Sequence, residues 1–149
     1  MGHGCCEWWR LITSAIGTIV GIAMFILFFI VWGNHAAGVW ALFTGVFAAV
    51  CFHLTYLHFR DLLETWHNVE TLQGMTLLGV LVSLAGAAGF AWYIFVAVYY
   101  QIPVLPMSDS ALIASVWAAM TLKFGLTLIC TSRSYVNEIY RETPPLLSV

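Results

Sequence analysis

The sequence predicts an all-α membrane protein with four transmembrane helices and both termini in the cytosol. Hydrophobic residues make up 62% of the 149-residue chain and charged residues only 8%, whereas charged residues make up about 25% of a typical soluble domain. The apolar residues form four continuous runs, each long enough for a helix to cross the hydrocarbon core of a bilayer. Strands of a membrane β-barrel would instead alternate apolar and polar residues. We therefore expect one four-helix transmembrane domain over residues 1–149.

The first two expected spans cover residues 11–32 and 36–57, and a short loop from Gly33 to His35 joins them. The first span is too long for a cleavable signal peptide, and the acidic side chain of Glu7 precedes it. We therefore expect it to remain in the protein as a membrane helix.

The third and fourth expected spans cover residues 73–100 and 111–130. The third is long enough to tilt in the bilayer or to project beyond it. Pro103 and Pro106 lie between the two spans and prevent a helix from continuing through the loop. The remaining residues, 131–149, are expected to form a cytosolic tail.

The connection between the second and third spans, residues 58–71, contains both charged and apolar side chains. Its apolar residues recur at helical spacing: Phe59, Leu62, Leu63, Trp66 and Val69. This pattern predicts a cytosolic extension of the second helix that lies along the membrane interface. We expect His58 and His67 to be solvated surface residues of this extension, with assistance to ligand transport as the alternative.

The arginines predict the orientation of the chain. They all precede the first span, lie between the second and third, or follow the fourth: Arg10, Arg60, Arg133 and Arg141. The other two loops contain no arginine or lysine. Because positively charged residues favour the cytosolic side, both termini are expected to face the cytosol.

Both ends of the chain carry short motifs. Cys5 and Cys6 lie just before the first span and are candidates for S-palmitoylation. Near the other end, Glu142 precedes Leu146 and Leu147 in the spacing of an acidic dileucine sorting signal. Such a signal would bind a clathrin-type adaptor and direct the protein to endosomes or lysosomes; a plain disordered end is the alternative.

The only lysine of the chain, Lys123, lies within the fourth apolar run, and no acidic residue lies within ten positions of it. Placing a cation at that depth costs about 2.5 to 3.5 kcal/mol. Intramembrane charges are therefore usually paired or functional. Lys123 predicts a membrane protein that binds an anionic group.

His53 lies within the second span, with Tyr56 on the same helix face three residues later. An imidazole can ligate a metal, although it can also hydrogen-bond within a helical core. Lys123 could bind a carboxylate of the same ligand, and the many aromatic side chains could contact a flat ring. Haem combines an axial metal site, two anionic propionates and an apolar macrocycle.

Several motifs resemble those of the haem-responsive-gene haem transporters, a four-span family. In the second span, His53 to Tyr56 resembles the family's His-x-x-Tyr motif, and Asp61 to Trp66 resembles its D-x-x-x-T-W motif. In the fourth, Ser115 to Trp117 resembles Ser-x-Trp, and Lys123 follows. The resemblance implies transport of haem from the endolysosomal lumen or cell exterior to the cytosol, with His53 as a ligand to the haem iron. We expect the transport to proceed by hand-off between axial ligands, with Tyr56, Trp117 and Lys123 at the binding site.

Two positions depart from the family pattern. After the last span, relatives carry a motif of the type F-A-R-K-Y, of which this chain keeps only Arg133 and Tyr135. We expect haem to be released to the cytosol near these two residues. Some relatives place a histidine before a glutamine in the second outer loop, where this chain has Tyr100. Tyrosinate can ligate ferric haem, so the expected outer haem ligand is Tyr100 or His35, with interfacial anchoring as the alternative.

The expected partners are haem as transported substrate, the lipid bilayer and a second copy of the chain, since four spans are few to enclose haem. Nothing in the sequence resembles a nucleophile with its base or an ATP-binding loop, so we expect no enzyme. The net charge of -2 is too small to predict a nucleic-acid partner. One alternative is a four-span structural or trafficking adaptor without a small-molecule ligand. Another is a copper carrier that uses His3, Cys5 and Cys6.

Overall fold

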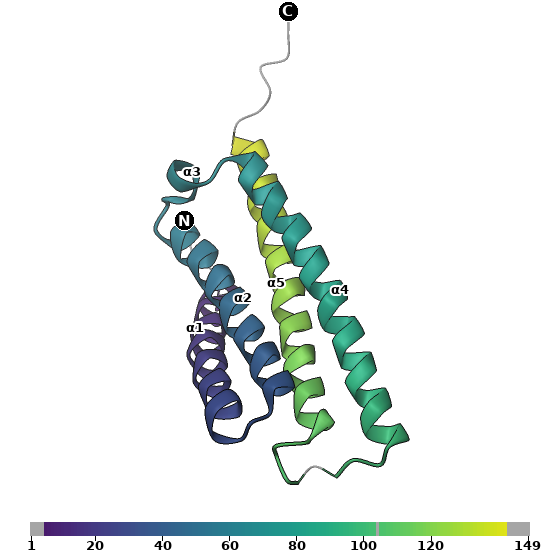
Figure 1. The fold of residues 1–149 in the computed structure, drawn as a ribbon. Coiled ribbons are helices and arrows are strands. Elements are labelled where there is room, and N and C mark those ends of the chain that lie inside the picture. Colours follow the sequence, from purple (N-terminus) through teal and green to yellow (C-terminus); the bar gives the residue numbers. More distant parts are fainter. Residues whose placement is uncertain (1–4, 104, 143–149) are drawn as a thin grey trace, which may run out of the picture.

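The computed structural model describes residues 5–103 and 105–142 and contains only helices within them (Figure 1). Four of these helical segments are long and apolar enough to cross a membrane, so the predicted fold class is confirmed. The elements in chain order are α1 (Cys5–Ile26), the π-helix η1 (Leu27–Val31), α2 (His35–Phe59), α3 (Leu63–Trp66), α4 (Val69–Tyr99) and α5 (Ala111–Glu142).

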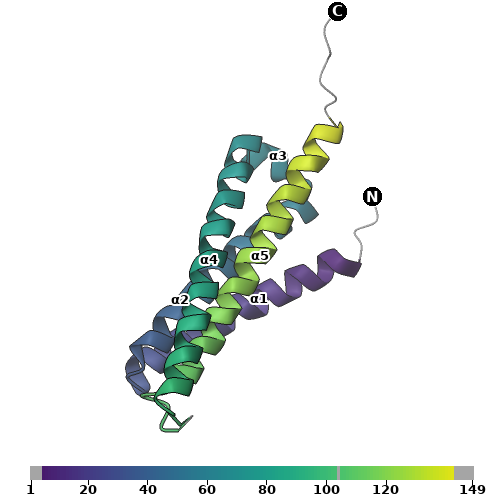
Figure 2. The same cartoon turned by 90° about the vertical axis from the view of Figure 1, so that its right-hand side faces the viewer.

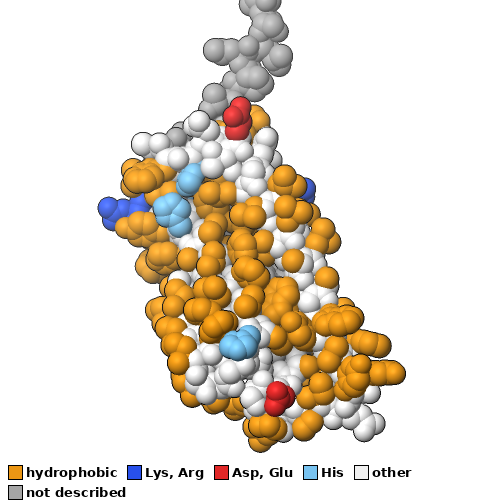
Figure 3. Space-filling view, viewed as in Figure 1, with side chains coloured by type: hydrophobic (Ala, Val, Ile, Leu, Met, Phe, Trp, Pro, Cys, Tyr) orange, Lys and Arg blue, Asp and Glu red, His pale blue; other side chains and the backbone are white. Residues whose placement is uncertain are grey.

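The outside of the bundle is largely apolar, as expected for a surface in contact with lipid. Figure 3 shows hydrophobic side chains over most of one face, with few charged groups. Ile19, Ile30 and Val98 are 70%, 75% and 71% exposed, respectively. In water such a surface would favour aggregation, whereas in a bilayer it is solvated by lipid chains.

The bundle is built from two helical hairpins. α1 packs on α2, α4 packs on α5, and contacts between α2 and α5 join the two pairs. Figure 2 shows α4 and α5 running side by side, while α1 diverges from α5 toward the N-terminus. The first hairpin depends on small residues: a Cβ at Gly21 would lie 2.5 Å from the backbone nitrogen of Gly45. Such close helix crossings are common in membranes because dispersion contacts drive helix association there.

Both ends of the described chain lie at the same end of the bundle as α3, and the α4–α5 loop lies at the opposite end (Figure 1). This arrangement agrees with an even number of spans. At the loop end, Asn34 donates through its side chain to the carbonyl oxygens of Met107 (2.8 Å) and Ser110 (3.3 Å). The α1–α2 loop and the α4–α5 loop are therefore tied together. The compartment that each end faces stays a prediction.

The prediction that α2 continues along the interface was wrong. α2 ends at Phe59, and Asp61 has a φ of +54°, a left-handed conformation that a helix cannot contain. The chain then forms the single turn α3, in which Leu63 is buried in the core. The apolar spacing that suggested a continuous helix instead reflects a turn folded back onto the bundle.

All four long helices extend beyond their expected spans at one end or both; α1, for example, begins at Cys5 rather than at residue 11. α4 begins at Val69 rather than at residue 73, and α5 continues to Glu142 instead of ending near residue 130. The first part of the expected tail is thus helical, because Tyr135 and Val136 are apolar residues that pack in the core. The polar residues between positions 131 and 142 suggested that the span ends near residue 130, but they do not interrupt the helix.

Candidate functional site

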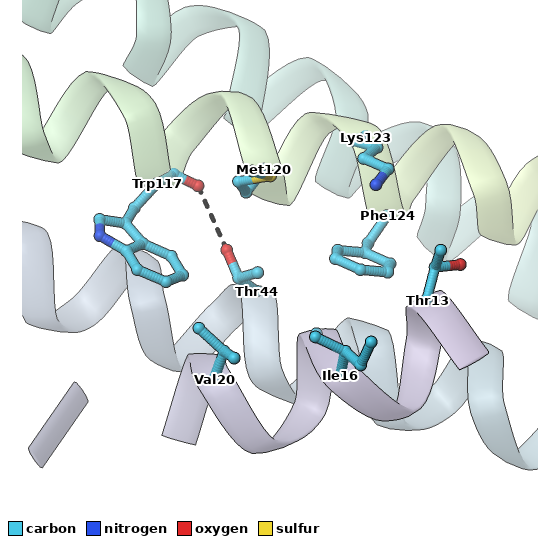
Figure 4. A pocket seen from close by; sticks show the side chains of 9 residues that line it. Thr13, Ile16, Val20, Thr44, Trp117, Met120, Lys123 and Phe124 are labelled. Carbon is cyan, nitrogen blue, oxygen red and sulfur yellow. Dashed lines mark hydrogen bonds between the residues drawn. The ribbon is translucent and has the colours of Figure 1, made fainter. Parts of the chain in front are cut away.

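A groove lies between α1 and α5, with Thr44 of α2 at its floor. Its inner part has a volume of about 210 Å³ and an almost entirely apolar lining. Figure 4 shows Trp117 toward one end of this groove, with Phe124 and Lys123 toward the other. The lining residues are Thr13, Ile16, Gly17, Val20, Thr44, Trp117, Met120, Lys123 and Phe124.

The groove continues past Lys123 into a second and larger part. This part has a volume of about 580 Å³ and shares Thr13 and Lys123 with the inner part. Arg10 and Trp9 line it from α1, and Leu126 is among the residues that line it from α5. Two cationic side chains, Arg10 and Lys123, therefore face one groove, and no acidic residue lines either part.

Lys123 is exposed on the surface of the bundle, in the middle of a membrane-spanning helix. Its Nζ lies 5.3 Å from the centroid of the Phe124 ring. A cation over an aromatic ring gains about 0.5 to 2 kcal/mol, which is less than the cost of placing a lysine at the centre of a membrane helix. The side chain is thus available to an anionic ligand or to an acid on another molecule.

Hydrogen bonds fix the floor of the groove. The hydroxyl of Thr44 donates to the carbonyl oxygen of Trp117 at 3.2 Å, as drawn in Figure 4, and lies 3.0 Å from the hydroxyl of Thr121. Thr44 and Thr121 are almost fully buried. Interhelical hydroxyl bonds of this kind stabilise helix pairs in membranes by about 1 kcal/mol. They hold α2 and α5 at a set distance and thereby position Trp117.

His53 lies on a different face of the molecule. On α2, Thr44 and Cys51 face α5, since both contact its backbone. His53 follows Cys51 by two residues, about 200° around a helix of 3.6 residues per turn, and its side chain is exposed. Within one chain, His53 therefore faces away from α5 and the groove that contains Lys123.

A second histidine accompanies His53. The imidazoles of His53 and His67 have centroids 5.7 Å apart and planes that meet at 88°. Burial, followed by the neighbouring His53, lowers the pKa of His67 and favours its neutral form. Only the folded-back connection reveals this pair, because the two residues are 14 positions apart in the sequence. Sequence reasoning treated His67 as a solvated residue and missed it.

Tyr56 is exposed near His53, as its spacing predicted, and its ring stacks on Phe52 with centroids 6.0 Å apart. Trp117 is half-buried, and its ring lies edge-on to Phe28 at 6.1 Å. Trp117 shares the groove with Lys123, whereas Tyr56 follows His53 on α2. The expected haem-site residues of the second and fourth spans therefore lie on two different faces of the bundle.

Arg133 and Tyr135, the expected release site, point in different directions. Arg133 is exposed and lines a groove of about 370 Å³ between α4 and α5, with Gln73 and Thr76. Tyr135 is only 2% exposed and stacks on His58 with ring centroids 4.2 Å apart. The prediction that His58 is a solvated surface residue was wrong, because its side chain is 18% exposed and lies against α5 and Glu7.

The two expected outer ligands are both exposed at the end of the bundle opposite α3. His35 begins α2, and its ring lies edge-on to Phe29 at 4.5 Å. Tyr100 follows α4, is 67% exposed and contacts the ring of Tyr99. Figure 3 shows histidine side chains on one face toward both ends of the bundle. Histidine and tyrosine side chains thus occur toward both ends of the bundle.

The motifs at the chain ends lie largely outside the described residues. Leu146, Leu147 and His3 are not described, and α5 ends at Glu142. Cys5 and Cys6 begin α1. Their lipidation and the binding of an adaptor to the dileucine motif stay predictions.

A comparison with protein families found a match to a family described as "Haem-transporter, endosomal/lysosomal, haem-responsive gene", over residues 72–123. The matched segment is about a third of the chain and runs along α4, through the α4–α5 loop and into α5 as far as Lys123. It includes Tyr100 and Trp117 but not His53. A comparison with solved structures found no match.

The matched family is one of transporters, which is not an enzyme class. Its description and the four long apolar helices agree with a multi-pass membrane protein of endosomes and lysosomes, as predicted. The match thus confirms the resemblance that the motifs indicated, to the haem-responsive-gene family of endosomal and lysosomal haem transporters.

Proposed function

We propose that this protein transports haem from the endolysosomal lumen or the cell exterior to the cytosol. The family match supports a role in haem transport in general. The observation that carries the proposal is the exposed cation Lys123, the last matched residue, in a groove otherwise lined mainly by apolar side chains. A lysine is retained at this depth because it binds an anion that the apolar walls also accommodate.

Haem has the chemistry that this groove requires. Its flat apolar macrocycle matches the rings of Trp117 and Phe124, and its two propionates match Lys123 and Arg10. The larger part of the groove, about 580 Å³, lies within the range of small-molecule sites. The apolar walls weaken screening by water and strengthen the attraction between each cation and a carboxylate.

We propose that haem passes between ligands in the order that their positions suggest. Tyr100 or His35 receives the iron on the outer side, and His53, with Tyr56 beside it, ligates it within the membrane. Arg133 and Tyr135 act on the cytosolic side. Because Tyr135 is buried against His58, its participation requires α2 and α5 to separate at that end.

A homodimer explains how His53 and Lys123 can act on one haem molecule. The two side chains lie on different faces of a single chain, so one copy does not place both of them on the same ligand. In a dimer, Lys123 of one copy and His53 of the other would contact opposite parts of a haem bound between them. Closed two-fold pairing is the commonest form of association in oligomeric proteins.

The first test is a titration of the detergent-purified protein with ferric haem, followed by absorbance in the Soret region. We expect saturable binding with a simple stoichiometry, weaker binding by Lys123→Met and a shifted Soret band in His53→Ala. Lys123→Arg is the matched control, because it keeps the charge. Identical, non-saturating uptake by all variants would indicate partitioning into the detergent micelle and would reject the proposal.

The second test measures direction. The protein is reconstituted in vesicles that contain a trapped haem-accepting apoprotein, and the orientation is established by protease cleavage of the C-terminal residues. We expect haem to reach the apoprotein in vesicles whose lumen corresponds to the cytosol. Saturable binding without transfer would instead support a haem-binding or adaptor function.

A further inference from the structure

We propose that His53 and His67 together provide the two axial ligands to the iron of haem. This inference rests on the proposed function and adds to it a residue, His67, that the motifs do not identify. The pair lies toward the end of the bundle that carries α3, where α2 ends and α4 begins. It would hold haem at the stage before release on that side.

The geometry of the two rings fits a shared metal. Their centroids are 5.7 Å apart. A metal with a nitrogen bond of about 2 Å on each side places two imidazole centres roughly 6 Å apart. The planes meet at 88°, and perpendicular rings are compatible with ligation because each imidazole can rotate about its own metal–nitrogen bond. The centroid spacing is therefore close to that of two imidazoles on one iron.

The number of ligands indicates haem rather than a free metal ion. A structural zinc site usually takes four protein ligands and a catalytic one three. Among the described residues, no group of three histidine, cysteine, aspartate or glutamate side chains could hold a metal. Haem iron already has four equatorial nitrogens from its macrocycle and needs only two axial ligands. A pair of histidines without a third ligand suits such an iron.

The local structure holds His67 in position. Its backbone N–H donates to the carbonyl oxygen of Leu63 at 2.9 Å, and Leu63 is buried in the core. α3 thus anchors the backbone of His67 to the bundle. The Nε2 atom of His67 is buried and has no hydrogen-bond partner in the described structure. A buried nitrogen without a partner is costly, and ligation of iron would satisfy it.

Apolar surface is present near the pair for the macrocycle. Tyr56, Leu62 and Trp66 are 42%, 40% and 67% exposed. Tyr56 belongs to the last turn of α2, Leu62 to the connection that follows it, and Trp66 to α3. Their apolar side chains supply contact area for the macrocycle next to the proposed ligands.

The test is the spin state of the ferric haem complex, measured by absorbance and electron paramagnetic resonance on the purified full-length protein. The wild type is expected to show a six-coordinate low-spin signal, since two imidazoles are strong axial ligands. His67→Gly is expected to bind haem but to lose this signal in favour of a high-spin one. Added imidazole should restore the low-spin signal in this variant, because it can occupy the space that the deleted ring leaves.

His58→Gln is the matched control, because His58 lies in the same region but contacts Glu7 and Tyr135 instead. It should keep the low-spin signal. Gel filtration and thermal unfolding establish that each variant is folded. Saturable binding with a high-spin wild type, or a low-spin signal that persists in His67→Gly, would overturn the inference and leave haem transport intact. Absence of saturable binding in every protein would instead reject the proposed function.

Discussion

The imidazole of His58 stacks on the ring of Tyr135, with centroids 4.2 Å apart and planes inclined by 23°. The same imidazole has its Nε2 atom 3.1 Å from Oε1 of Glu7 and 3.7 Å from Oε2 of Glu138. His58 therefore joins α2 to both α1 and α5 at the end of the bundle that carries the termini. This contact closes the bundle at the proposed release side.

Removal of the His58 ring should destabilise the bundle. His58→Ala loses the stacking, worth about 0.5 to 1.5 kcal/mol, and a hydrogen bond to a carboxylate, worth about 1.5 to 3 kcal/mol. We expect a total loss of about 2 to 4.5 kcal/mol in the free energy of unfolding, measured by thermal denaturation in detergent. His58→Gln keeps a donor for Glu7 and should lose less. Equal stability of all three proteins would show that this contact does not hold the helices together.

Lys123→Met should change stability and binding in opposite directions. Removal of an intramembrane cation relieves a cost of about 2.5 to 3.5 kcal/mol, so the variant should unfold at a higher temperature in lipid. It should bind haem about tenfold more weakly, which corresponds to the loss of about 1.4 kcal/mol from one ion pair. Thermal unfolding in lipid nanodiscs and haem titration measure the two effects on one preparation.

Lys123→Arg separates charge from side-chain shape in this prediction. It should keep most of the haem affinity and gain no stability, since the guanidinium remains charged. If Lys123→Arg binds haem as weakly as Lys123→Met does, the groove recognises something other than a positive charge.

Gly21 should not tolerate a side chain. A Cβ there would lie 2.5 Å from the nitrogen and 2.6 Å from the Cα of Gly45, and backbone atoms cannot move aside easily. We expect Gly21→Ala to lower the free energy of unfolding by about 1 to 3 kcal/mol, as overpacking usually does. Gel filtration and thermal unfolding in detergent measure the effect.

Gly74→Ala is the matched control, because nothing lies within 4 Å of its added Cβ and it is also within a helix. Alanine in a helix interior is favoured over glycine by about 0.5 to 1 kcal/mol. This variant should therefore be as stable as the wild type or more so. A loss of stability in Gly74→Ala similar to that in Gly21→Ala would contradict the packing argument.

Asn34 should control the order of both the α1–α2 loop and the α4–α5 loop. Its Oδ1 accepts from the backbone N–H of Ala37 at the start of α2, and its Nδ2 donates to Met107 and Ser110. Asn34→Ala should lose the helix cap, worth about 1 kcal/mol, and also the tie to the α4–α5 loop. We expect faster amide hydrogen exchange in residues 105–110, measured by mass spectrometry.

Asn34→Ser separates these two effects. Serine can still cap α2, but it is too short to keep both bonds to the second loop. Exchange near Ala37 should stay close to that of the wild type, while exchange in residues 105–110 should rise. Unchanged exchange in both loops for Asn34→Ala would show that other contacts order them.

The sequence determined the number of spans, their approximate limits and the clustering of the four arginines at one end of the bundle. These features depend on the length of apolar runs and the spacing of charges, which are local properties of the chain. Lys123 was also identifiable, because an intramembrane charge is conspicuous in any apolar run. The two termini lie at one end for the same reason, since four crossings return the chain to its starting side.

The sequence did not determine which way each helix faces. A membrane helix is apolar on the side that packs and on the side that meets lipid, so no polar stripe marks its inner face. Only helix packing separated His53 from Lys123 and buried Tyr135 while exposing Arg133. The left-handed Asp61 ended α2 and folded the chain back, which brought His67 to His53. Contacts between segments distant in the sequence, rather than any local pattern, decided the composition of the candidate sites.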